Sequence, residues 1–341
     1  MKVVKLKDIC TKGSSSLKQK DVQGKTGKYP VFGASGLIGY IDSYHQEKEY
    51  IGIVKDGSGI GRVMFLPPKS SVIGTLQYIL TKPGYDINYI GYCLLSLDLS
   101  RHKQGAAIPH IYFKDYGERI ITIDENIEEQ RKIVNRLNCS FEKIDSIRKN
   151  AEQAKTELTR IVLEKYSHYF GPQNNSTQLG SILNLRRGHD LTHAQMIPGD
   201  IPVAGSNGII GWHNERTNIS PCVTVGRSGS VGMVNFYDSC WAHNTVLYVD
   251  NYKGNNPRYI YHLLKGLPLK EHGGGVAVPT LNRNNLHPLL VGYTHDIKEQ
   301  IKISQELDEL TSKIKKLEDN YNNTVILCND LKQALLKKTF E

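Results

Sequence analysis

Two long stretches of the chain place apolar residues three and four positions apart, with polar residues between them. They span residues 126–170 and 295–341, and neither contains glycine or proline. This spacing is typical of helices that pair in a coiled coil, and a helix of roughly 40 residues is about 60 Å long. The apolar positions expected in the seam are Ile133, Leu137, Ile144, Ile147, Leu158, Ile161, Leu307, Leu310, Ile314, Leu317, Leu331 and Leu335. The alternative is that each helix packs only on its own domain.

The segments before the two long stretches have a different pattern. Short β-branched runs such as YIGIV and CVTV are separated by glycine, proline and polar residues, which predicts strands. Residues 87–97 and 258–267 are apolar over a helical length, and Asn256 and Pro257 are suited to cap and begin the second of these helices. We therefore expect an α+β protein with two β-rich domains. The expected segments are a first domain at 1–125, a helix at 126–170, a second domain at 171–294 and a helix at 295–341.

The two halves of the chain repeat one sequence. YPVFGASGLIGY at 29–40 returns as IPVAGSNGIIGW at 201–212, and the offset falls only from 172 to 170 along the chain. VKDGSGIGRV at 54–63 matches VGRSGSVGMV at 225–234, and ENIEEQRKI at 125–133 matches HDIKEQIKI at 295–303. The second match pairs Gln130 with Gln300. The chain therefore contains two copies of one unit, and antiparallel pairing of the long helices would relate them by a pseudo-two-fold axis.

The charge of the chain is concentrated in the β-rich parts. The net charge is +9 and the isoelectric point is about 9.0, and +7 of this excess lies outside the two long helices. A basic surface favours a polyanionic partner, most often nucleic acid. No apolar run approaches the length of a membrane span and no signal peptide is evident, so we expect a cytoplasmic protein. The scattered cysteines, with no CxxC spacing, favour reduced thiols.

The chain resembles the specificity subunits of type I restriction-modification systems over essentially its whole length. The resemblance rests on the repeated YPVFGASGLIGY and IPVAGSNGIIGW phrases, the KDGSGIG and GRSGSVG turns, WAHNTVLYV, GGVAVPTLN and the I-x-E-Q start of both long helices. The chain departs from the family in having compact recognition domains. Its first copy also has IPHIYF at 108–113, where the second has VPTLNR at 278–283.

The resemblance implies a role without catalysis. Each β-rich domain would read one part of a bipartite, asymmetric DNA target, and an antiparallel coiled coil would fix the gap between the parts. The subunit would itself hold no cofactor or metal. It would dock two modification subunits, which methylate adenine with S-adenosylmethionine, and restriction subunits, which use ATP and magnesium to translocate and cut DNA.

The motifs of catalytic chemistry are incomplete in this sequence. NNPRY at 255–259 lacks the double proline of an amino-methylation motif, and DGSGIGR at 56–62 has Arg62 in place of the last glycine of a dinucleotide loop. GKT at 24–26 lacks the upstream glycine of a phosphate loop, and no carboxylate accompanies His189 and His193 as in a zinc protease. These absences favour a recognition subunit over an enzyme.

Candidate DNA contacts are cationic and amide side chains expected in loops between strands, because such groups bind phosphates and base edges. Lys55 and Arg227 are favoured among them, since both lie beside the same repeated turn. The candidates are Lys12, Lys18, Lys20, Lys55, Arg62, Arg101, Lys103, Gln104, Arg186, Arg187, His189, Asn207, Arg227, Ser228 and His243.

Two other functions are compatible with parts of this pattern. Two β-rich modules on a coiled coil could form a scaffold that binds protein or carbohydrate, and the 19 tyrosines would suit a sugar surface. The basic β-rich parts argue against the scaffold, and salt-dependent DNA binding would exclude it. A self-sufficient modification enzyme is disfavoured because the cofactor and methylation motifs are incomplete.

Overall fold

A computed structural model describes residues 1–57, 59–105, 109–172, 176–274 and 279–340. The phrases IPHIYF at 108–113 and GGVAVPTLN at 274–282 therefore lie partly outside the described residues. The chain divides into two compact units, Met1–Ala151 with Asn323–Glu341, and Glu152–Asn322. The divisions fall inside the two long helices, so each unit holds one β-rich domain and part of each helix. The four segments expected from the sequence stay a prediction.

In the β-rich domain of the first unit, the first and last strands pair with each other. Its three sheets have the strand orders β2-β8-β5-β6, β4-β3-β7 and β1-β9. All pairings are antiparallel except that of β3 with β7. The elements are β1 (Lys2–Lys5), α1 (Leu6–Ile9), β2 (Cys10–Ser14), β3 (Tyr29–Gly33), β4 (Gly36–Ile41), β5 (Tyr50–Val54), β6 (Val63–Leu66), β7 (Ser71–Val72), β8 (Leu76–Thr81), α2 (Ile87–Ser96), α3 (Phe113–Tyr116) and β9 (Ile120–Ile123).

The second unit repeats this topology. Its sheets have the orders β11-β17-β14-β15, β13-β12-β16 and β10-β20, together with a short β18-β19 pair. Gly36 and Gly208 take positive φ angles of 108° and 105° in the matching hairpin turns, which explains one repeated glycine of the opening phrase. The elements are β10 (Ser176–Gln178), α5 (Leu179–Ile182), β11 (Asn184–Arg187), β12 (Ile201–Gly205), β13 (Gly208–His213), β14 (Cys222–Gly226), β15 (Val234–Tyr237), β16 (Trp241–Ala242), β17 (Val246–Asn251), α6 (Pro257–Gly266), β18 (Gly273–Gly274), β19 (Thr280–Leu281), α7 (Arg283–Leu286) and β20 (Leu290–Gly292).

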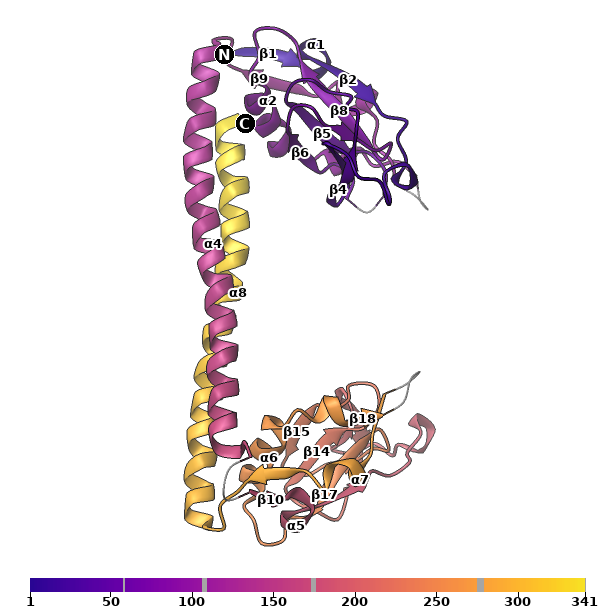
Figure 1. Ribbon diagram of the computed structural model, residues 1–341, viewed down its shortest axis with the longest axis vertical. Coiled ribbons are helices and arrows are strands. Elements are labelled where there is room, and N and C mark those ends of the chain that lie inside the picture. Colours follow the sequence, from indigo (N-terminus) through magenta and orange to yellow (C-terminus); the bar gives the residue numbers. More distant parts are fainter. Residues whose placement is uncertain (58, 106–108, 173–175, 275–278, 341) are drawn as a thin grey trace. The chain divides into compact units, whose positions relative to one another are not determined.

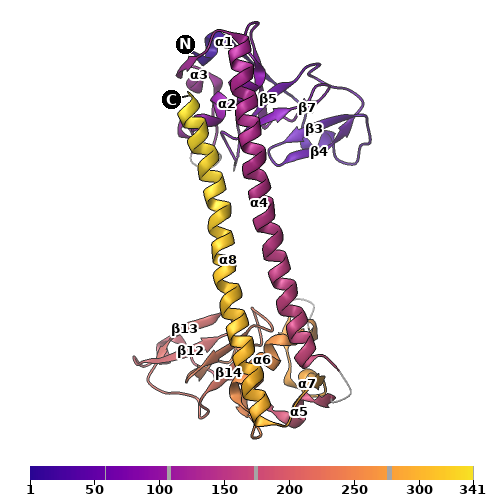
Figure 2. The ribbon, with the colours of Figure 1, turned by 90° about the vertical axis from the view of Figure 1, so that its left-hand side faces the viewer.

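The two long helices are α4 (Ile127–Phe170) and α8 (Ile297–Phe340), and they run antiparallel within each unit (Figures 1 and 2). In the first unit, Lys332 of α8 pairs with Asp145 of α4 at 2.6 Å. In the second unit, Lys165 of α4 pairs with Glu306 of α8 at 2.5 Å. The start of one helix thus lies beside the end of the other, and the predicted antiparallel pairing is confirmed.

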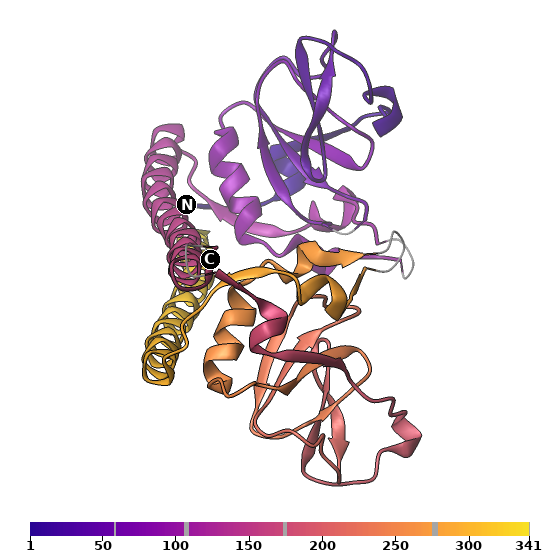
Figure 3. The same cartoon turned by 60° about the horizontal axis from the view of Figure 1, so that its bottom comes forward.

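The short helices α2 and α6 connect the sheets to the long helices (Figure 3). In the first unit, Tyr89 of α2 packs on Phe340 at the end of α8, with ring centroids 5.1 Å apart. In the second unit, Tyr259 of α6 packs on Phe170 at the end of α4, with centroids 5.4 Å apart. The core of each β-rich domain therefore includes the C-terminal end of the long helix that begins in the other half of the chain.

A buried glutamine attaches each domain to the beginning of its own long helix. The Gln130 side chain accepts from the backbone N–H of Asp86, the cap of α2, at 2.8 Å, and donates to the Asp124 carbonyl at 2.7 Å. Gln300 makes the same two bonds in the second unit, to the Asn256 N–H at 2.9 Å and the Thr294 carbonyl at 2.8 Å. Both side chains are fully buried. The repeated glutamine of the sequence is therefore a structural tie between helix and domain.

The second unit has an ionic network around the buried His262, where the first unit has a neutral pair. His262 of α6 is hydrogen-bonded to Asp308 of α8 at 2.9 Å and to Tyr166 of α4 at 2.8 Å. Arg258 binds the same carboxylate through two nitrogens, at 2.8 and 2.6 Å. Burial lowers the pKa of His262 to about 4. The matching residues of the first unit are Tyr92 and Asn138, which form one hydrogen bond.

The buried stripe of the long helices corrects part of the predicted seam. Leu137, Ile144, Leu307 and Ile314 are buried, and Ile133, Leu158, Leu310 and Leu335 are half-buried. Ile147, Ile161, Leu317 and Leu331 are exposed, at 52%, 38%, 41% and 50%, so their assignment to the seam is wrong. The stripe advances by four residues where three were predicted, for example from Leu158 to Val162 in place of Ile161. Steps of three and four turn to opposite sides of a helix, and the position of the partner helix selects between them.

Replacing Gln300 with alanine should lower the free energy of unfolding by about 1–3 kcal/mol, because the Asn256 N–H and the Thr294 carbonyl would lose their buried partner. Urea unfolding of the full chain measures this change. Gln153→Ala, on an exposed position of α4, is the control and should be nearly neutral. Equal effects of the two variants would contradict the structural role of Gln300.

Leu307→Ala should cost about 2–5 kcal/mol because it opens a cavity at a fully buried position, whereas Leu317→Ala should cost little. The midpoint of thermal unfolding compares the two variants directly. A larger loss for Leu317→Ala would restore the seam that the sequence predicted.

Acid should destabilise the second unit through His262. Its pKa of about 4 in the folded state lies below the ordinary value of 6.5, so the unfolded chain binds the proton more readily between these values. The contribution of the neutral His262 to the free energy of unfolding is present above pH 6.5, and it falls by about 2 kcal/mol between pH 7 and pH 5. Urea unfolding at the two pH values measures the loss. The double variant His262→Tyr with Asp308→Asn, which copies the first unit, should remove most of this dependence, and an unchanged dependence would exclude His262 as its source.

Candidate nucleic-acid interface

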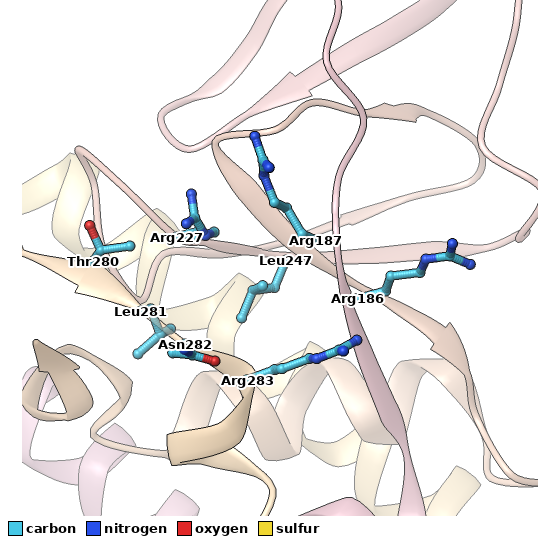
Figure 4. A pocket seen from close by; sticks show the side chains of 8 residues that line it. All are labelled: Arg186, Arg187, Arg227, Leu247, Thr280, Leu281, Asn282 and Arg283. Carbon is cyan, nitrogen blue, oxygen red and sulfur yellow. The ribbon is translucent and has the colours of Figure 1, made fainter.

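Four arginines surround one pocket of the second unit, with a volume of about 370 Å³. Figure 4 shows their guanidinium groups extending from β11, the turn after β14 and the start of α7, around Leu247 and Leu281. The pocket is lined by Arg186, Arg187, Arg227, Leu247, Thr280, Leu281, Asn282 and Arg283.

Backbone pairing brings these arginines together. Arg186 and Arg187 lie on β11 opposite Tyr248 and Leu247 of β17. The N–H of Arg227 donates to the Thr245 carbonyl at 2.8 Å, and its carbonyl accepts from the N–H of Leu281 at 2.8 Å. The Asn282 side chain caps α7 by accepting from the Asn284 N–H at 3.0 Å, which sets Arg283 at the first helical position.

Most of the positive charge at this pocket is uncompensated. Arg187 forms an ion pair with Asp190 at 3.1 Å. A hydrogen bond from Asn244 and the charge of Arg187 lower the pKa of Asp190 below its ordinary value. Among the described residues, no carboxylate pairs with Arg186, Arg227 or Arg283, and Arg283 donates only to the Leu185 carbonyl at 3.4 Å. Adjacent unpaired guanidinium groups repel one another, so this arrangement suits a bound polyanion.

The two units share one cationic position. The Lys55 N–H donates to the Thr75 carbonyl at 3.0 Å and its carbonyl accepts from the Ile111 N–H at 3.0 Å, as Arg227 does with Thr245 and Leu281. The sequence match paired Lys55 with Gly226, so the structure corrects that pairing by one residue. The reason is one extra residue in the turn of the first unit: Gly61 bonds back to Val54, whereas Gly232 bonds back to Gly226.

The other candidates of the first unit do not gather in one place. Lys12, Lys18, Lys20 and Lys103 are exposed. Arg62 donates to the Ala34 carbonyl at 2.8 Å, Arg101 pairs with Asp98 at 3.1 Å, and Gln104 donates to Asp115 at 2.9 Å. Their roles in DNA binding stay predictions.

The remaining candidates of the second unit take part in local contacts. The His189 ring lies 5.4 Å from that of Trp241, and His243 is hydrogen-bonded to Thr245 at 3.0 Å and to the Leu191 carbonyl at 3.2 Å. Asn207 is hydrogen-bonded to Ser230 at 3.2 Å, and Ser228 forms a backbone bridge with Thr280.

Sequence reasoning missed Thr280, Asn282 and Arg283. The signal was present in VPTLNR, the phrase that replaces IPHIYF of the first copy, because the difference places Arg283 where Phe113 stands. No cluster of potential metal ligands occurs among the described residues, and none of the helices described there is apolar enough over a sufficient length to cross a membrane.

A model of a known protein family matches part of the chain. Residues 1–156 match the model of the type I restriction modification DNA specificity domain. No match was found among curated proteins. The match covers less than half of the chain, and its residues lie in the first β-rich domain and the first part of α4.

Two solved structures with TM-scores above 0.5 have a similar fold. One, from work on complex assembly and conformational transition of a type I restriction-modification system, has a TM-score of 0.77 at 14% identity, over 99% of this chain and 96% of the other. The HsdS subunit from Thermoanaerobacter tengcongensis has a TM-score of 0.56 at 13% identity, over 99% and 95%. The S subunit from M. genitalium is 19% identical over 100% and 96%, with a TM-score of 0.46.

Proposed function

We propose that this chain is the DNA-recognition subunit of a type I restriction-modification complex. The observation that carries the proposal is the specificity-domain match at residues 1–156, in a chain whose second unit repeats the topology of the first. Two copies with different side chains would read two different sequences. The target is therefore bipartite and asymmetric, with one part for each unit.

The arginine pocket supports DNA as the ligand. Guanidinium groups bind phosphates and guanine edges, and four of them line the pocket of the second unit. Lys55 at the position equivalent to Arg227 gives the first unit a cation in the same structural context. The scaffold function that binds protein or carbohydrate has no comparable support.

The proposal extends to partners and cellular location. The chain docks two modification subunits and restriction subunits, and it acts in the cytoplasm, where host DNA is available. S-adenosylmethionine binds to the modification subunits, and ATP and magnesium bind to the restriction subunits, while this chain takes no cofactor. The long helices α4 and α8, each shared between the two units, set the gap between the two parts of the target.

Adenine methylation mapped across a genome tests this function. The chain and its modification subunit, expressed in a host without adenine methylation, should methylate an asymmetric motif of two short blocks with a fixed gap. The modification subunit alone is the control and should leave the genome unmethylated. Methylation that is independent of this chain, or that lacks a bipartite motif, would contradict the proposal.

A further inference from the structure

The two units carry very different charges at matched positions of the same sheet. Arg186 and Gly13 both lie opposite a tyrosine of the neighbouring strand, Tyr248 and Tyr78, and Arg187 and Ser14 lie one position further along. Arg283 is the first residue of α7, and Phe113 is the first residue of α3. Each helix lies just after the residue, Leu281 or Ile111, whose N–H donates to the carbonyl of Arg227 or Lys55. Of the four cationic positions in the second unit, the first unit retains only the one at Lys55.

The single cation among the matched positions of the first unit, Lys55, is also partly neutralised. Lys55 lies 3.9 Å from the carboxylate of Asp56, and Asp56 is hydrogen-bonded to His110 at 2.7 Å. Asp56 and His110 also form a backbone bridge, and the corresponding bridge of the second unit joins Ser228 and Thr280, whose side chains carry no charge. The carboxylate of Asp56 would repel a phosphate group at a position where Arg227 would attract one.

The position of Gly13 is also covered by a neighbouring ring. A Cβ atom added to Gly13 would lie 2.0 Å from Cε2 of Tyr78, so a side chain there would require the Tyr78 ring to move. The first site therefore has no side chain at the position of Arg186.

We propose that the second unit holds the sugar-phosphate backbone of its part of the DNA target through Arg186, Arg227 and Arg283. This arginine pocket contributes more to the salt-dependent affinity of the complex than the matching site of the first unit does. This inference rests on the proposed function.

Phosphodiester groups fit the pocket better than base edges do. One arginine reads one guanine through a single fork, whereas several guanidinium groups in one concave site of about 370 Å³ need several negative charges to offset their repulsion. Double-stranded DNA supplies such charges at short intervals along both strands, and each phosphate neutralised adds about 0.9 to the slope of log K against log salt concentration.

The salt dependence of DNA binding tests the difference between the units. The complete complex with modification subunits is titrated with a duplex that carries the methylated motif, from low to high salt. Arg186→Ala, Arg227→Ala and Arg283→Ala should each reduce the slope by about one. Lys55→Ala, at the position equivalent to Arg227, is the matched comparison and should reduce the slope by less, because the nearby Asp56 carboxylate already partly neutralises Lys55. Thermal unfolding checks that each variant is folded.

Two results of this titration would overturn the inference. One is a Lys55→Ala slope that falls as far as that of Arg227→Ala, and the other is an unchanged slope in all three arginine variants. If the wild-type complex binds the motif duplex no better than a scrambled one, the proposed function fails as well. If the complex still prefers the motif duplex but one of these two results is obtained, only the inference fails.

Modified duplexes distinguish backbone from base contacts. Neutral methylphosphonate linkages in the part read by the second unit should weaken binding of the wild-type complex, and should weaken the Arg227→Ala complex much less. Replacing guanine with 7-deazaguanine in the same part should affect both complexes equally. A 7-deazaguanine effect that disappears in Arg227→Ala, without any methylphosphonate effect, would assign the arginines to base reading and overturn the proposal.

Discussion

A single buried amide at the beginning of each long helix constrains the rest of each unit. Gln130 and Gln300 join three parts of the chain: the helix that carries them, the segment that leaves the last strand, and the N-terminus of α2 or α6. A buried amide is costly unless both its carbonyl and its amino group are paired, so the helix cannot slide or rotate against the domain without breaking these bonds. The aromatic contacts Tyr89–Phe340 and Tyr259–Phe170 then attach the end of the other long helix to the same core.

The two units share backbone hydrogen bonds and sheet orders but differ in the side chains around them. The backbone bonds of Lys55 and Arg227 are equivalent, as are the sheet orders around them. The side chains that surround these bonds are not equivalent, since a glycine, a serine and a phenylalanine in the first unit replace three arginines of the second. A common backbone with different side chains at one site suits a protein whose two halves bind different sequences of the same kind of ligand.

The attachment of the long helices also differs between the units. Tyr92 and Asn138 form a neutral hydrogen bond, whereas His262, Asp308 and Arg258 form a charged network at the matching positions. His262 can satisfy both neighbours in one neutral tautomer, with Nε2–H donating to Asp308 and Nδ1 accepting from Tyr166. The same junction is therefore insensitive to mild acid in one unit and sensitive to it in the other.

The sequence by itself determined the repeat, the two uninterrupted helices, the β-rich domains and the match of Gln130 with Gln300, because all of these follow from local pattern or from comparison of the chain with itself. The structural role of the two glutamines came from the structure. Only the tertiary structure decided which face of each helix is buried, since steps of three and four residues are equally helical and the partner helix selects between them. The tertiary structure also decided which cationic side chains lie at one site. Arg186, Arg227 and Arg283 are 41 and 56 positions apart in the sequence, and strand pairing brings them to one pocket. The exchange of Phe113 for Arg283 was visible in the sequence, but its meaning depended on neighbours that no local pattern specifies.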